Sequence, residues 1–292
     1  MEAKVRNKQA RTAYLLIAPA LILFIGFTAY PFIWSAQISL TSWDGLNAVK
    51  KFVGFQNYIS LFGDKEFRQS LTVTAIYTVT VTAVSTILGF LIALMLQRRG
   101  KSSVIYRTIF FSPVVTATVA AAVVWQLLFD PYVGVIDLGL RAMHLPAPNW
   151  LSDTHWALPA VIIVGIWKRL GFAVIVYAAG LSSLPTSCYE AADLDGVSGW
   201  QKVRYLTIPL MRPVTTLVLI TGFIDAIQVF DHIFILTSGG PMGSTNVMSL
   251  MLFNQGFKLF RLGYASAIGW TLFLMILVLT MLQWQIRRRR EL

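Results

Sequence analysis

The chain has 292 residues, of which 56% are hydrophobic, and a mean hydropathy of +0.66. Because its apolar residues fall in long blocks, this composition excludes an ordinary soluble domain. The net charge of +11 has the magnitude seen in nucleic-acid-binding proteins, but Lys and Arg gather near the ends of the apolar blocks, which indicates membrane topology and no nucleic-acid partner.

Six apolar blocks are long enough to cross a bilayer, whose hydrocarbon core of about 30 Å needs roughly 20 helical residues. None alternates polar and apolar residues as the strands of a β-barrel do. We therefore predict an all-α, polytopic membrane protein embedded in lipid, with a single domain over residues 1–292. The predicted spans are 13–34, 70–96, 105–129, 157–181, 213–236 and 263–286.

The distribution of basic residues predicts the orientation of the chain. With the N-terminus inside, the cytoplasmic segments hold 15 of the 24 Lys and Arg residues and the external segments hold 7. Since basic residues are retained on the cytoplasmic side, both termini are predicted to be cytoplasmic. The first block is longer than a signal-peptide core and no clear cleavage site follows it, so we interpret it as an uncleaved anchor.

Two segments between spans are predicted to be external. The first, about 35–69, mixes aromatic residues with Gly, Asn and Asp, and is long enough to fold on the membrane surface and receive a partner. The second, 130–156, contains Pro131, Gly134, Pro146 and Pro148, which favour a turn-rich loop.

The chain offers no site for a chemical reaction of its own. Gly100-Lys101-Ser102 resembles the end of a phosphate-binding loop, but the motif needs a Gly five residues earlier, where Met95 stands, and a preceding strand. His232 lacks the second His or Cys of a zinc site, and Cys188 lacks a disulfide partner in the chain. We therefore expect no catalytic residue, metal or cofactor in this chain, and no enzyme.

Charged residues near the middle of two spans need an explanation. Lys168 and Arg169 lie in the fourth span and Asp225 in the fifth, where each unpaired charge costs about 2.5 to 3.5 kcal/mol. Gln228 and His232 follow Asp225 at helical spacings and are predicted to share its face, with Asp231 at the edge. These groups either line a water-accessible cavity near the midplane or form an ion pair that only joins two spans.

Residues 184–212, between the fourth and fifth spans, carry helix-capping signals. Ser187 is followed by Glu190 and Ser198 by Gln201, the spacing of a capping box, and Gly196 between them suits a left-handed helix end. We predict two short helices with a sharp turn at Gly196, and call the whole segment the elbow.

The elbow resembles the membrane permeases of binding-protein-dependent ABC importers, in the sugar-uptake branch that includes the maltose permeases. Their signature is Glu-Ala-Ala, three residues, Gly, nine residues, and an apolar-x-apolar-Pro ending. Here it is Glu190-Ala191-Ala192, Gly196 and 206–209, with Leu206 in place of the usual Ile. The Leu-Thr-Ser-Gly-Gly-Pro run at 236–241 is also similar, and the likeness extends from about residue 70 to the C-terminus.

The resemblance implies that the elbow is a coupling helix in a cleft of an ATPase subunit. Glu190 and Asp195 would face a basic partner, Ala191 and Ala192 would allow close approach, and Gly196 would permit the turn. The alternative, a helix resting on lipid headgroups, suits an acidic face poorly. The implied partners are a second permease subunit, two cytoplasmic ATPase subunits that bind ATP and Mg, and an external solute-binding protein, in a prokaryotic inner membrane.

The resemblance also implies a substrate pathway through the fourth and fifth spans. Alignment on Trp167 and on Gly239-Gly240-Pro241 places seven residues in it, and Gln228 joins them by its spacing. Ala226 and Val229 stand where maltose permeases have Asn, so a sugar other than maltose is favoured. The paired basic residues leave glycerol 3-phosphate or a glycerophosphodiester as an alternative; an ion-driven secondary transporter would leave the elbow unexplained. The seven residues are Lys168, Arg169, Phe172, Gly222, Asp225, Ala226 and Val229.

Overall fold

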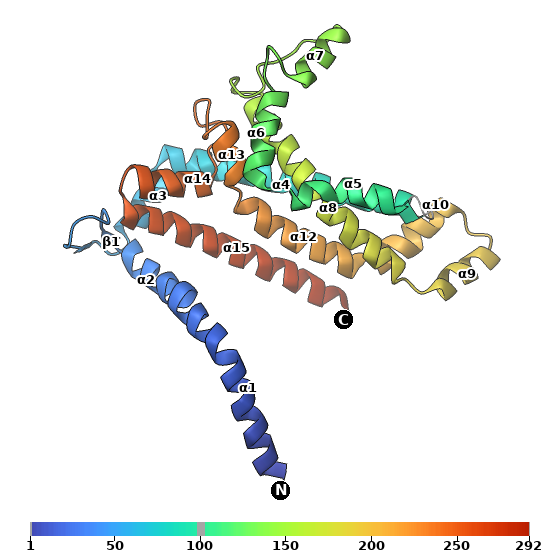
Figure 1. Ribbon diagram of the computed structural model, residues 1–292, viewed down its shortest axis with the longest axis horizontal. Helices are drawn as coiled ribbons and strands as arrows, with labels where there is room; N and C mark the ends of the chain where they lie inside the picture. Colours follow the sequence, from blue (N-terminus) through green and yellow to red (C-terminus); the bar gives the residue numbers. More distant parts are fainter. Residues whose placement is uncertain (1, 98–102, 292) are drawn as a thin grey trace. The chain divides into compact units, whose positions relative to one another are not determined.

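The computed structural model describes residues 2–97 and 103–291, with side chains from 13 to 96 and from 108 to 285 except 284 (Figure 1). The tripeptide Gly100-Lys101-Ser102, with the neighbouring Arg98 and Arg99, lies outside the described residues. The chain divides into two compact units, Met1–Gly63 with Leu252–Thr271, and Asp64–Met251 with Leu272–Leu292.

The prediction of an all-α membrane protein with about six spans is confirmed by the length and composition of the helices. Five helices of the described chain can each cross a membrane, and a sixth crossing is formed if a bent pair counts as one span. That pair, Thr108–Val115 and Thr118–Leu128, bends by 108° where the sequence predicted one uninterrupted block. The five are Ala13–Ser39, Lys65–Leu96, Ala157–Ser182, Arg212–Leu236 and Leu262–Gln283.

The first unit contains most of the segment that follows the first span, up to Gly63, together with residues 252–271. Strands β1 and β2 pair antiparallel, with Thr41 opposite Phe52. The amide of Asn57 donates to the carbonyl oxygens of Ser39 and Thr41 at 2.7 and 2.9 Å, which ties α3 to the hairpin. The elements of this unit are α1 (Glu2–Phe24), the π-helical turn η1 (Ile25–Ala29), α2 (Tyr30–Ser39), β1 (Thr41–Ser42), β2 (Lys51–Phe52), α3 (Gln56–Gly63), η4 (Asn254–Lys258) and the beginning of α15 (Leu262–Glu291).

The second unit holds the remaining spans and the elbow. Its 130–156 segment, predicted as a turn-rich loop, also contains the helix α7. The elements are α4 (Lys65–Gln97), α5 (Ser103–Val115), α6 (Thr118–Leu128), α7 (Val135–Ala142), α8 (Ala157–Ser182), α9 (Thr186–Leu194), α10 (Gly199–Lys202), η3 (Val203–Thr207), α11 (Ile208–Leu210), α12 (Arg212–Ile227), α13 (Asp231–Leu236), α14 (Met248–Phe253) and the end of α15.

Helix α4 packs against α8 and α12, and one of its buried faces is a seam of small hydroxyl side chains. Along this face of α4, a buried Ser or Thr occurs at every fourth position. Small side chains of this kind let helix backbones approach closely in a membrane protein. At Gly89 of α4, an added Cβ would lie 2.6 Å from the Cβ of Ala173, so α8 touches the helix backbone there. The seam comprises Ser70, Thr74, Thr78, Thr82 and Thr86.

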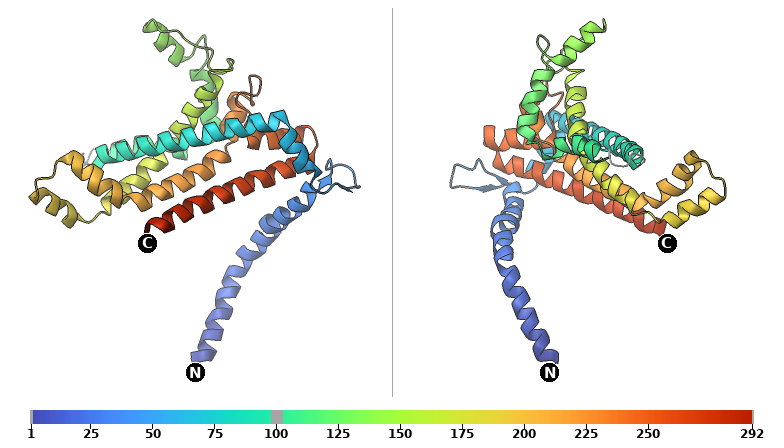
Figure 2. Two further views of the ribbon diagram at one scale, coloured as in Figure 1. Left: turned by 180° about the vertical axis from the view of Figure 1, so that it is seen from behind. Right: turned by 45° about the vertical axis from the view of Figure 1, so that its right-hand side comes forward.

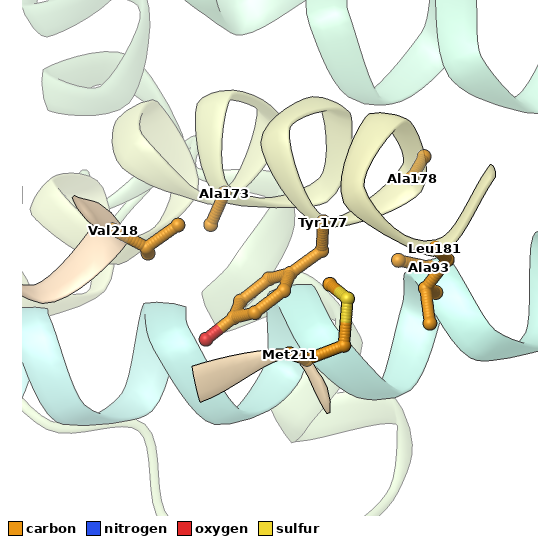
Figure 3. Close-up of a cluster of buried hydrophobic side chains, with 7 residues drawn as sticks. All are labelled: Ala93, Ala173, Tyr177, Ala178, Leu181, Met211 and Val218. Atoms are coloured by element: carbon orange, nitrogen blue, oxygen red, sulfur yellow. The ribbon is translucent and has the colours of Figure 1, made fainter. Parts of the chain in front are cut away.

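The ends of α8 and α12 that carry the elbow are joined by a buried apolar cluster (Figure 3). Tyr177 of α8 points toward α4 and lies beside Met211, at the beginning of α12, and both are almost fully buried. A Cβ on Gly180 would lie 2.8 Å from the Cε atom of Met211 and 2.8 Å from Cγ2 of Val214, so α8 and the start of α12 approach closely at this glycine. The elbow therefore leaves and enters the unit from two closely packed helices.

Candidate functional site

Six of the eight residues predicted for the substrate pathway line one cavity, which we call the polar cavity. It has a volume of about 240 Å³ and lies among α4, α5, α8, α12 and α13. Gly222 and Gln228 do not line it, whereas four residues that the sequence analysis did not assign to the pathway do: Tyr77, Val81, Val114 and Gly165. The predicted residues that line it are Lys168, Arg169, Phe172, Asp225, Ala226 and Val229; His232 completes the lining.

Arg169 and Asp225 form an ion pair at the edge of this cavity. The Nη1 atom of Arg169 donates to Oδ2 of Asp225 at 2.5 Å, and Nη2 donates to the carbonyl oxygen of Val218 at 3.0 Å. The two partners differ in environment, because the Arg169 side chain is 7% exposed and that of Asp225 is 66% exposed. The pair thus joins α8 to α12, as expected if it links two spans. It also borders the cavity, as expected if it contacts the solute.

Lys168 is held by the bend between α5 and α6 and does not pair with Asp225. Its ammonium group donates to the carbonyl oxygen of Pro113 at 2.8 Å and to that of Thr116. These carbonyls lie at the C-terminal end of α5, where a helix has unpaired acceptors and a partial negative charge. Lys168 therefore stabilises the broken span.

His232 hydrogen-bonds to Tyr77, with 2.9 Å between its Nε2 atom and the tyrosine hydroxyl. His232 is 7% exposed and Tyr77 is 2% exposed, so the bond satisfies two buried polar groups. Tyr77 lies on α4, within the predicted span 70–96. Tyr77 lies one helical turn after Thr74 and one turn before Val81, next to the hydroxyl seam. This spacing is the signal that could have identified it as a buried residue.

The prediction that Asp225, Gln228 and His232 share one helix face is wrong. Helix α12 ends at Ile227, Gln228 caps it and is exposed, and α13 begins at Asp231. The carbonyl oxygen of Val229, left free by the break, accepts a hydrogen bond from the hydroxyl of Ser249. A tertiary contact therefore supports the break, and His232 of α13 lines the cavity although it does not continue the face of α12.

Gly222 lets α12 approach Arg169. A Cβ at this position would lie 2.7 Å from Cγ2 of Thr82 and 3.0 Å from Nη2 of Arg169. The guanidinium group cannot retreat freely, because Asp225 and Val218 hold it. Gly222 thus shapes the wall behind the ion pair instead of lining the cavity.

Replacement of Gly222 by alanine is expected to lower the free energy of unfolding by about 1 to 3 kcal/mol, because the extra methyl group overpacks a fixed site. Thermal unfolding of the detergent-purified protein measures this loss. Gly139→Ala on α7 is the matched control, since a Cβ there meets nothing within 4 Å. Equal melting temperatures for the two variants would contradict the close packing at Gly222.

The turn of the elbow has the geometry that the sequence predicted. Gly196 is left-handed, with φ of +69°, and its N–H donates to the carbonyl oxygen of Asp193 at 3.1 Å. The N–H of Val197 donates to Ala192 at 3.0 Å, which completes the hydrogen-bond pattern of a glycine-terminated helix. Helices α9 and α10 therefore meet at a sharp, hydrogen-bonded corner.

The two predicted capping boxes have different outcomes. Ser198 and Gln201 form the reciprocal pair at the start of α10, as predicted. The box at Ser187 and Glu190 is wrong, because α9 begins at Thr186 with Pro185 as its cap, two residues before the predicted cap at Ser187. Glu190 is thereby left exposed, without a capping role.

The elbow presents acidic and apolar side chains together. Glu190, Ala191 and Asp195 are exposed, as is Gly196, and Ala192 is partly buried. Asp193 pairs with Lys202 within the elbow. Leu194 and Trp200, which the elbow signature does not single out, are 90% and 69% exposed. Figures 1 and 2 show α9 and α10 beyond the end of α8 and, within this unit, far from α7. Such a surface suits contact with another protein.

Comparisons with known proteins agree with the resemblance found in the elbow. The trehalose/maltose transport system permease protein MalF of Thermococcus litoralis is 33% identical over 291 residues, covering 100% of this chain and 98% of its own length. The lactose transport system permease protein LacF of Rhizobium radiobacter is 33% identical over 284 residues, covering 95% of this chain and 94% of its own.

Known structures share the fold. A chain of a bacterial alginate ABC transporter, solved in complex with an alginate pentasaccharide-bound periplasmic protein, matches with a TM-score of 0.86 at 24% identity, over 97% of this chain and 96% of that one. The family model described as binding-protein-dependent transport system inner membrane component matches residues 85–291. The chain therefore belongs to the family of inner membrane components of binding-protein-dependent transport systems.

Proposed function

We propose that this chain is the permease subunit of an ATP-driven importer that moves a carbohydrate into the cell. The observation that carries the proposal is the exposed elbow. Near its corner at Gly196 it presents the carboxylates of Glu190 and Asp195 together with the apolar side chain of Leu194. Such a surface can receive force from another subunit. ATP and Mg belong to two ATPase subunits docked there, a second permease completes the membrane pathway, and a solute-binding protein delivers the sugar.

The proposed orientation has both termini and the elbow in the cytoplasm. Binding of ATP to the partner closes the ATPase dimer, the elbow moves, and the polar cavity exchanges access from one side of the membrane to the other. The direct packing of α8 and α12 around Tyr177 and Met211 supports this route, because it links the elbow to the two helices that hold Arg169 and Asp225.

A carbohydrate is the favoured solute. The relatives named above transport trehalose and maltose, or lactose, according to their names. The polar cavity offers a carboxylate, a guanidinium group and the Phe172 ring, which suit a hydroxylated solute with an apolar face. A phosphate is less well served, because Lys168 is engaged by two carbonyls and Arg169 by Asp225.

Uptake into proteoliposomes tests the function. The chain is reconstituted with its second permease and its ATPase, the solute-binding protein is added outside, and labelled trehalose, maltose, lactose and glycerol 3-phosphate are offered. We expect at least one sugar to accumulate only when ATP is present at the elbow side. Accumulation of glycerol 3-phosphate alone would overturn the sugar assignment, and uptake driven by an ion gradient without ATP would overturn the importer.

A further inference from the structure

Another pocket lies at the C-terminal end of α6, whereas the bend between α5 and α6 is at its N-terminal end. It has a volume of about 410 Å³ and is formed by the end of α6, the segments on both sides of α7, and the end of α13. Figure 1 shows α13 next to α6, in agreement with their close packing. We call it the loop pocket. Its distinctive lining residues are Gln126, Asp130, Asn149 and Ser152, with the aromatic rings of Phe129 and Trp150.

The aromatic rings of the loop pocket are fixed in place. The rings of Phe129 and Trp150 lie 5.4 Å apart between centroids. The indole N–H of Trp150 donates to Oδ1 of Asp137 at 2.7 Å, and Asp137 is 1% exposed, so the indole orientation is held from behind. A rigid aromatic surface binds a ligand at a low cost in conformational entropy.

The aromatic contacts continue from the loop pocket to the neighbourhood of the polar cavity. Trp125 lies 5.3 Å from Phe129 and 5.6 Å from Trp167, measured between ring centroids. Trp167 directly precedes Lys168, which lines the polar cavity. A series of ring contacts therefore runs from the loop pocket to Trp167, the neighbour of Lys168 on α8.

The polar groups of the loop pocket are open for binding. Within the described part of the chain, the side-chain amides of Gln126 and Asn149 have no hydrogen-bond partner, and both residues are exposed. One carboxylate oxygen of Asp130 accepts from the N–H groups of Tyr132 and Val133 at 2.8 and 3.0 Å. These bonds lower the pKa of Asp130, so its carboxylate is charged at neutral pH and its second oxygen can accept from a ligand.

A carbohydrate ring matches this set of groups. Its C–H face packs against aromatic rings, its hydroxyl groups donate to a carboxylate, and side-chain amides both donate to and accept from the same hydroxyls. The volume lies within the roughly 300 to 1,000 Å³ of ordinary ligand pockets, whereas the polar cavity is smaller.

We propose that the loop pocket is a second carbohydrate subsite, which holds a sugar ring between its delivery from the binding protein and its entry into the polar cavity. The inference rests on the proposed function and orientation, in which this end of α6 faces the outside. Gln126 and Asn149 are the specificity groups, and Phe129 and Trp150 are the platform.

The double substitution Gln126→Ala and Asn149→Ala tests the subsite, because both side chains are exposed and neither supports the fold. In the reconstituted importer, we expect the number of sugar molecules transported per ATP hydrolysed to fall about tenfold, since two hydrogen bonds are lost. The sugar used is whichever of trehalose, maltose or lactose the wild type takes up. ATP hydrolysis stimulated by the loaded binding protein should stay within about twofold of wild type. Thr154→Ala, in the same segment but outside the pocket, should change neither quantity.

Three results would overturn the subsite, and they are distinguishable. Unchanged sugar transport per ATP in the double variant shows that the pocket holds no sugar. A parallel loss of stimulated hydrolysis and of binding-protein affinity shows that the surface receives the protein. Failure of the wild type to transport any sugar defeats the proposed function itself, and the subsite with it.

Discussion

Replacing Gly196 with proline should abolish ATP-driven uptake while leaving the protein inserted in the membrane. Gly196 has φ of +69° and donates its N–H to Asp193 at 3.1 Å. Proline fixes φ near −65° and has no N–H, so it can meet neither requirement. The corner between α9 and α10 would open, and the acidic and apolar surface of the elbow would lose its shape. The spans α8 and α12 lie outside the altered turn and should still insert.

Asparagine at the same position is the matched control. Among residues other than glycine, asparagine tolerates the left-handed conformation well, and it retains the N–H. A Cβ at Gly196 meets nothing within 4 Å, so the larger side chain itself causes no clash. We expect Gly196→Asn to retain most of the uptake, and both variants to reach wild-type levels in the membrane fraction. Normal uptake by the proline variant would refute the coupling role of the elbow.

The spans and the elbow were predictable because their signals are local. A span follows from about twenty consecutive apolar residues, and the corner follows from one glycine between two capping sequences. The Ser198 box was correct for the same reason, whereas at the start of α9 Pro185 is the cap, two residues before the predicted Ser187. Where two capping signals lie close together, as at Pro185 and Ser187, the sequence alone does not decide where the helix begins.

The interior of the candidate site was only partly predictable, because contacts between distant segments decide it. The sequence left open whether Lys168 or Arg169 would pair with Asp225; Arg169 does, and the carbonyls exposed by the bend after α5 bind Lys168. The break after Ile227 contains neither proline nor glycine, and the hydroxyl of Ser249 stabilises it. Tyr77 reaches the cavity through its bond to His232, 155 positions away. The spacing of residues along one helix cannot predict a hydrogen bond to a residue so far away in the sequence.

The ion pair between Arg169 and Asp225 can be separated into a structural and a transport role by comparing single and double substitutions. Asp225→Leu leaves the guanidinium group of Arg169 buried without its carboxylate. Removal of one partner from a fully buried pair costs about 3 to 5 kcal/mol, but Asp225 is 66% exposed and water replaces part of the interaction. We therefore expect a smaller loss of stability, about 1 to 3 kcal/mol, measured by thermal unfolding in detergent.

The double variant with leucine at positions 169 and 225 should recover that stability, because hydrophobic residues of suitable size replace buried ion pairs at little or no cost. Uptake should nevertheless stay at least about tenfold below wild type, since a solute bound in the polar cavity loses hydrogen bonds to two charged groups, each of about 1.5 to 3 kcal/mol. If uptake recovered together with stability, the pair would be only a link between α8 and α12, and the solute would have to be recognised by other residues of the cavity, with Tyr77, Phe172 and His232 as the next candidates.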